Sequence, residues 1–385
     1  MPDFSTMPEV FVSSADLAAA VSREVKLGRL RKIGSRLYTR NLKEQPEQLV
    51  QRNLWPLVDA YLPGALIADR TALENRPAAD GSVFLIADHK RNIALPGVTL
   101  RPRKGPVALE TDRPFIGSLR LASPARAFLE NMRPSRARSG VARTLSGREI
   151  EERLDEILRQ SGEPAIQRLR DDARQVANQL GMTDEFQDLD TLIGSLLGTR
   201  ETQLASPVGI ARAAGVPYDP LRLELFQQLF AELASTAPVT RPARHTDGSA
   251  LPFFEAYFSN FIEGTEFAVD EAANIVFNGH IPAARPADAH DVLGTWKIVS
   301  DQSEMSRCPK SSQELMVLLK SRHAQIMEGR PDKGPGKFKT DPNRAGGTLF
   351  VGPELVEGTL MKGFESYRGL TSPLHRAIFM MFLIS

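Results

Sequence analysis

The chain has 385 residues, with 48 Lys and Arg against 47 Asp and Glu, so its net charge of +1 gives no overall attraction to nucleic acid or membranes. Its 42% hydrophobic and 25% charged residues are typical of globular proteins, and its length predicts two or three domains. Its one cysteine, Cys308, excludes an intrachain disulfide, and no apolar run reaches the ~18 residues of a membrane helix, so we expect a cytoplasmic protein without membrane attachment.

The first predicted elements are a helix within residues 13–30 and a hairpin within residues 29–41. Leu17, Val21 and Val25 recur at four-residue spacing, which indicates an amphipathic helix. In "RLRKIGSRLYTRN" a Gly-Ser turn separates two short runs that favour strands. A short helix followed by a hairpin is the outline of a winged helix, which we assign to residues 1–45.

The predicted hairpin is strongly basic, with six Lys and Arg and no acid between Gly28 and Lys43. Clustered basic side chains bind the DNA backbone. The pattern therefore predicts a DNA-binding surface, formed by Arg29, Arg31, Lys32, Arg36 and Arg40. The alternative interpretation is a solvated basic hairpin without a ligand.

The middle of the chain predicts a small α/β module over 46–142 and a helical region over 143–235. Short strand-like runs alternate with Pro and Gly between two helical segments in the module. Ser146 and Glu149 have the spacing of a capping box at the start of the helical region. The fold class we expect is mostly α with a smaller α/β part.

The stretch "FSNFIEGTEF" (258–267) places a carboxylate and a glycine within a predicted amphipathic helix. Ser259 and Glu263 are neighbours at i and i+4, on the edge of an apolar stripe that we expect to be buried. That stripe consists of Phe254, Phe258, Phe261 and Ile262. Gly264 within a helix would cost about 1 kcal/mol relative to Ala. The alternative is a surface Glu beside a helix end at Gly264.

Sequence on both sides of this stretch resembles the Fic family, over about residues 240–385. "SNFIEGTEFAVDEAANIVFNG" (259–279) is similar to the inhibitory helix of the family and the helix after it. "GKFKTDPNRAGGTLFVGP" (336–353) is similar to the family's β-hairpin flap, and "PLHRAIFMMFLIS" (373–385) to the helix before its catalytic loop. The resemblance implies a helical Fic-type domain over 236–385.

The resemblance also implies transfer of AMP from ATP to a hydroxyl of a target protein, with ATP and Mg²⁺ as cofactors. Ser259, Glu263 and Gly264 would form the inhibitory motif. The flap would dock the target by strand addition. Its residues are Gly336, Lys337, Phe338, Lys339, Thr340, Gly347, Thr348, Leu349 and Phe350. A second copy of the chain, in a homodimer, is a further partner that we consider.

The family's catalytic signature, His-Pro-Phe, two residues, Gly-Asn-Gly-Arg, does not occur in the chain. It would begin a few residues after Ser385, so we expect a truncated Fic domain, from a premature stop or an incomplete sequence. We therefore assign no catalytic or metal-binding residue and expect that these residues alone do not transfer AMP. We interpret His323 and His375, which lie on helical stretches, as structural.

The N-terminal part resembles AbiEi-type antitoxin regulators, over about residues 10–140. The similar segments are "LGRLRKIGSRLYTRN", "ALIADRTALENRP", "DGSVFLI" and "ARAFLENMRPSR". This resemblance implies a winged helix followed by a small α/β domain. The alternative function is therefore a DNA-binding regulator, and a third is a purely structural helical protein.

Overall fold

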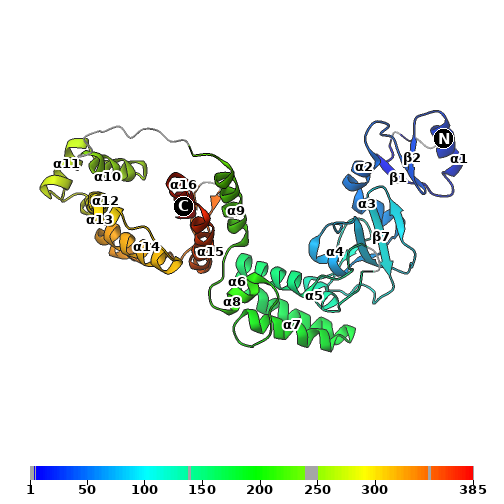
Figure 1. Cartoon of the computed structure of the whole chain (residues 1–385). Helices are drawn as coiled ribbons and strands as arrows, with labels where there is room; N and C mark the ends of the chain where they lie inside the picture. The colour runs from blue at the N-terminus through cyan, green and yellow to red at the C-terminus, as the bar shows by residue number, and fades with distance from the viewer. Residues whose placement is uncertain (1–3, 5, 138–139, 239–249, 346–347, 385) are drawn as a thin grey trace. The chain divides into compact units, whose positions relative to one another are not determined.

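The structure is a computed structural model that describes residues 4, 6–137, 140–238, 250–345 and 348–384. Helices predominate over two small sheets and a hairpin, which confirms the mostly α fold with a smaller α/β part (Figure 1). The chain divides into two compact units, Met1–Ala213 and Ala214–Ser385. None of the helices in the described ranges combines the length and apolar character that a membrane crossing requires.

The first unit begins with a helix and a three-stranded antiparallel sheet in the order β1-β3-β2. Its elements are β1 (Val10–Val12), α1 (Ala18–Lys26), β2 (Arg31–Gly34) and β3 (Leu37–Thr39). Phe11, Val21 and Leu30 form the apolar contact between this helix and the sheet. The predicted helix and hairpin are therefore both present.

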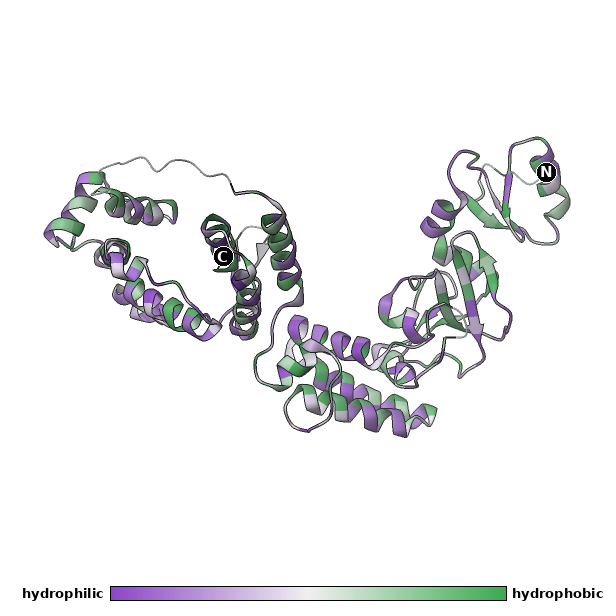
Figure 2. Ribbon diagram, in the orientation of Figure 1, coloured by the Kyte–Doolittle hydropathy of each residue, from purple (hydrophilic) through white to green (hydrophobic). Residues whose placement is uncertain are grey.

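A six-stranded mixed sheet follows, in the order β6-β7-β5-β4-β9-β8. Its strand β5 is buried at all five positions, and Figure 2 shows green, hydrophobic segments within the sheet region of this unit. The elements of this part are α2 (Pro46–Arg52), α3 (Leu54–Tyr61), β4 (Leu66–Ile67), α4 (Asp69–Glu74), β5 (Ser82–Ile86), β6 (Ile93–Leu95), β7 (Val98–Arg103), β8 (Arg113–Pro114), β9 (Arg120–Leu121) and α5 (Pro124–Asn131).

Three helices complete the first unit: α6 (Gly147–Leu180), α7 (Thr183–Leu196) and α8 (Pro207–Ala213). The predicted capping box starts α6, since the Glu149 carboxylate accepts from the Ser146 N–H at 2.7 Å and the Ser146 hydroxyl accepts from the Glu149 N–H at 3.3 Å. Gly162, with φ 71°, kinks α6. Phe128 of α5 shares one core with α6 and α7, so the segments 46–142 and 143–213 form a single compact unit.

The second unit consists of helices and one hairpin. Its elements are α9 (Pro220–Ser235), α10 (Leu251–Ile262), α11 (Val269–Asn278), α12 (Pro286–Val299), α13 (Gln302–Met305), α14 (Ser312–Ile326), β10 (Arg344–Ala345), β11 (Thr348–Leu349), α15 (Val356–Gly369) and α16 (Pro373–Ile384). Phe226 of α9 packs with Phe364 and Phe379 of α15 and α16. Helix α9 thus belongs with the second unit, although the sequence grouped it with the helices before it.

Candidate functional site

The predicted inhibitory helix, α10, buries a different face from the one that the sequence indicated. Phe253, Ala256 and Tyr257 are buried, and the Tyr257 hydroxyl donates to the Phe267 carbonyl at 3.1 Å. The predicted stripe is exposed instead, at 41% for Phe254, 55% for Phe258, 39% for Phe261 and 81% for Ile262. Since α10 is apolar on both faces, its contacts with α11 and α12 decide which face is buried.

Glu263 and Gly264 lie at the end of α10 rather than within it. Gly264 has φ +92°, a conformation that favours glycine and ends helices. Glu263 and Ser259 are exposed, and within the described ranges no cation forms an ion pair with Glu263. The expectation that Glu263 is held against buried surface is therefore wrong, and the alternative of a surface Glu beside a helix end matches the structure.

The segment predicted as the flap contains an antiparallel hairpin, in which Arg344 pairs with Leu349 and Ala345 with Thr348. A pocket of about 370 Å³ lies beside this hairpin. It is lined by Arg222 and Phe226 of α9, Leu319, Lys320 and His323 of α14, residues 337–339, Asn343, Phe350, Val351, Val356, Thr359 and Leu360 of α15, and Leu383 and Ile384 of α16. We call it the hairpin pocket.

The predicted flap residues have different positions around this pocket. Lys337, Phe338, Lys339 and Phe350 line it. Gly336, with φ +74°, donates its N–H to His323 Nδ1 at 3.0 Å. Thr340 is exposed, Thr348 and Leu349 lie in β11, and Gly347 lies outside the described residues.

The charge of the hairpin pocket is the feature that sequence reasoning missed. Its lining includes Arg222, Lys320, Lys337, Lys339 and His323, and none of the described lining residues is acidic. Arg222 and His323 are about 100 positions apart in the sequence, so no local pattern could have joined them. His323, which the sequence indicates to be structural, does accept the Gly336 N–H through Nδ1, and it also lines the pocket.

The predicted DNA-binding residues all lie on or beside the β2–β3 hairpin, but some also hold the local structure. Arg31 donates to the Glu44 carbonyl at 2.5 Å, and Arg36 Nε donates to the Ser13 carbonyl at 2.9 Å. Arg29 lies 3.5 Å from Glu24. Lys32 and Arg40 are exposed. The surface is therefore accessible, with Arg31 the least available to a ligand.

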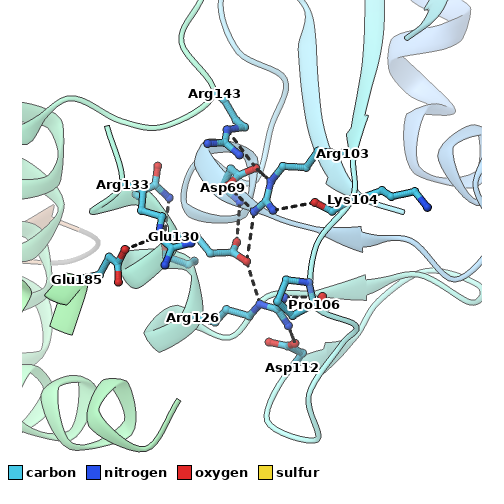
Figure 3. Close-up of polar contacts among 12 residues, drawn as sticks. Asp69, Arg103, Lys104, Pro106, Asp112, Arg126, Glu130, Arg133, Arg143 and Glu185 are labelled. Atoms are coloured by element: carbon cyan, nitrogen blue, oxygen red, sulfur yellow. Dashed lines mark hydrogen bonds and ion pairs between the residues drawn. The ribbon is translucent and has the colours of Figure 1, made fainter. Parts of the chain in front are cut away.

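A buried charge network is another dense group of titratable residues in the first unit (Figure 3). Arg126, fully buried, donates to Asp112 at 2.7 Å and to Glu130 at 3.0 Å. Arg103 donates to both oxygens of Asp69, at 2.8 and 2.9 Å. Burial, and then the charge of Asp69, raise the pKa of Glu130 above its ordinary value.

We interpret this network as one that stabilises the fold. Each of its carboxylates has an arginine partner, as buried charges require. Arg126 also donates to the carbonyls of Pro106 and Val107, which ties the loop before β8 to α5. We interpret it as a clamp that holds this loop on the module.

The cofactors implied by the resemblance fit the structure unequally. The cations of the hairpin pocket suit phosphate groups. Mg²⁺ prefers carboxylate oxygens, and the described residues contain no group of three or more His, Cys, Asp or Glu that could hold a metal. Comparison with protein-family models, curated proteins and solved structures gave no match to this chain.

Proposed function

We propose that the second unit provides the nucleotide-binding and target-docking parts of an AMP transfer of the Fic type, in which ATP donates AMP to a hydroxyl of a target protein. The catalytic signature of the family is not in this chain, so we do not expect these residues alone to complete the transfer. The observation that carries this proposal is the hairpin beside a cationic pocket, because the reaction needs a nucleotide site next to a docking edge. The pocket's volume, apolar walls and few charged groups are those of a small-molecule site.

Different parts of the second unit would have different roles in this function. The hairpin pocket would hold the nucleotide, while β10 and β11 would offer backbone groups to an extended segment of the target. Ser259 and Glu263, exposed at the end of α10, would be available to restrain the nucleotide site. Mg²⁺ would neutralise phosphate charge when bound.

Photo-crosslinking with 8-azido-ATP tests the nucleotide site. We expect label on peptides of α14, residues 337–339 or α15, and protection by unlabelled ATP. Label confined to the first unit, or label that ATP does not displace, would overturn the proposal. Since the chain lacks the His-Pro-Phe signature, we expect no AMP incorporation from α-labelled ATP into added proteins; incorporation above a no-protein control would contradict this.

We propose DNA binding by the β2–β3 hairpin as a second function. It is favoured by the exposure of Lys32 and Arg40 on a hairpin whose sheet order, β1-β3-β2, is compatible with a winged helix. It would make the chain a DNA-bound regulator with an appended second unit. Phosphate contacts would supply most of the affinity.

Salt dependence of duplex binding tests this function. Each lost phosphate contact lowers the slope of log affinity against log salt by about 0.9. We expect Lys32→Ala to lower it by about that amount, and Arg168→Ala, an exposed position on α6, to leave it unchanged. If wild type and Lys32→Ala had equal slopes of log affinity against log salt, the hairpin would not be part of the DNA interface.

A further inference from the structure

Within the described ranges, the cations of the hairpin pocket have no carboxylate in an ion pair with them, whereas many arginines elsewhere in the chain do. Within the described ranges, the Arg222 guanidinium has no ion-pair or hydrogen-bond partner, although it lines a pocket. By contrast, Arg322 of the same helix, α14, is paired with Glu304 at 2.9 Å. A partly buried guanidinium without an acid favours an anionic ligand.

Lys339 is held in the same wall by contacts that leave its charge uncompensated. Its ammonium group donates to the side-chain oxygen of Asn343 and lies 5.7 Å from the centre of the Phe350 ring. Burial lowers the pKa of Lys339, and the charge of Arg222 lowers it further, while Glu354 acts in the opposite direction. Two neighbouring cations repel each other, and an anion between them would relieve that repulsion.

His323 adds a hydrogen-bond donor to the pocket. A hydrogen bond from the backbone of Gly336 selects the tautomer of its imidazole ring. Its Nδ1 accepts the Gly336 N–H at 3.0 Å. A ring nitrogen that accepts carries no proton, so in the neutral ring the proton is on Nε2. His323 lines the pocket, and Nε2 is the nitrogen that remains for a ligand.

We propose that the hairpin pocket binds a polyphosphate group through Arg222, Lys339 and the Nε2–H of His323. The inference rests on the proposed function only in taking a nucleotide as the source of that group. Phe226, Leu360 and Leu383 give the pocket apolar walls next to these three polar groups, which suits a ligand with one charged and one apolar end.

Titration calorimetry of the full chain with sodium tripolyphosphate tests the site. We expect Arg222→Met and Lys339→Met each to weaken binding about tenfold or more, as expected for loss of a charged hydrogen bond. His323→Asn keeps an acceptor for the Gly336 N–H and removes the distal donor, so it should weaken binding while the thermal midpoint stays unchanged. Arg368→Met, an exposed position on α15, is the matched control and should bind as wild type does.

Competition distinguishes the sources of the phosphate. We expect ATP and tripolyphosphate to displace each other and adenosine to displace neither. Absence of tripolyphosphate binding, or undiminished binding by folded Arg222→Met and Lys339→Met variants, would overturn the inference even if ATP labels the second unit. Tripolyphosphate binding lost in these variants, together with ATP label confined to the first unit, would support the inference and reject the nucleotide as its source.

Discussion

At the scale of single residues, Arg126 is the position where a substitution should cost most. Its guanidinium compensates two buried carboxylates, Asp112 and Glu130. Removing one partner of a buried charge network typically destabilises a protein by about 3–5 kcal/mol. We expect Arg126→Ala to lower the free energy of unfolding of the first unit by about this amount, measured by urea denaturation.

The control for this prediction is an arginine with a partner on the surface. Arg148 pairs with Glu152 at 2.9 Å, with the two side chains 61% and 43% exposed. Exposed pairs of this spacing contribute about 0.3–0.5 kcal/mol. A loss in Arg126→Ala as small as in Arg148→Ala would show that the network does not hold the loop.

Glu130 should make stability depend on pH with a definite sign. Its pKa is raised in the folded state by burial and by Asp69, so the folded chain holds this proton more tightly than the unfolded chain does. Its contribution to the free energy of unfolding is therefore full below its unfolded pKa and is lost as the pH rises through the raised, folded pKa.

The comparison with Glu130→Gln isolates this contribution, because other titrating groups are common to both proteins. As the pH rises from about 4, the ordinary pKa of a glutamate, wild type should lose stability relative to the Gln variant over the range that begins there. Urea denaturation across this range measures the difference. If the stability of wild type instead increased relative to the variant as the pH rises, the neighbouring arginines would lower the pKa of Glu130 by more than burial raises it.

At the scale of elements, the two faces of α10 should respond differently to polar substitution. Phe258 is 55% exposed and Phe253 is 6% exposed. We expect Phe253→Ser to cost about 3 kcal/mol or more, since a buried aromatic side chain is lost. Phe258→Ser should cost less than about 0.5 kcal/mol and reduce aggregation, because it removes exposed apolar surface. Equal costs in thermal unfolding would show that the stripe including Phe258 is buried in solution.

Sequence patterns predicted elements better than they predicted faces or sites. The capping box at Ser146 and the basic hairpin are local features, and each is present. The hairpin near Arg344, which the family resemblance implied, is also present. The local sequence does not decide which face of α10 is buried, because the helix has apolar residues on both faces. The contacts of Tyr257 with Phe267 and of Asn260 with Thr295 help to decide it. The hairpin pocket is lined by residues of helices α9, α14, α15 and α16. Its positive charge could not be predicted from the sequence, because the basic residues come together only when these helices pack.

At the scale of the whole molecule, the two units should unfold as separate cooperative bodies. In the described ranges, no core cluster mixes residues of both units. The chain has two tryptophans, and each unit holds one, Trp55 in the first and Trp296 in the second. Trp55→Phe and Trp296→Phe variants therefore let fluorescence report one unit at a time.

Ligands that bind one unit should shift only that unit's transition. A ligand at 100 times its dissociation constant stabilises the folded form by about 2.7 kcal/mol. Tripolyphosphate should therefore raise the unfolding midpoint reported by Trp296 and leave that reported by Trp55 unchanged, with chloride at equal ionic strength as the control. Duplex DNA should have the opposite effect if the β2–β3 hairpin binds it. Two tryptophans that report one common transition, shifted equally by either ligand, would mean that the units unfold together and that binding to one stabilises both.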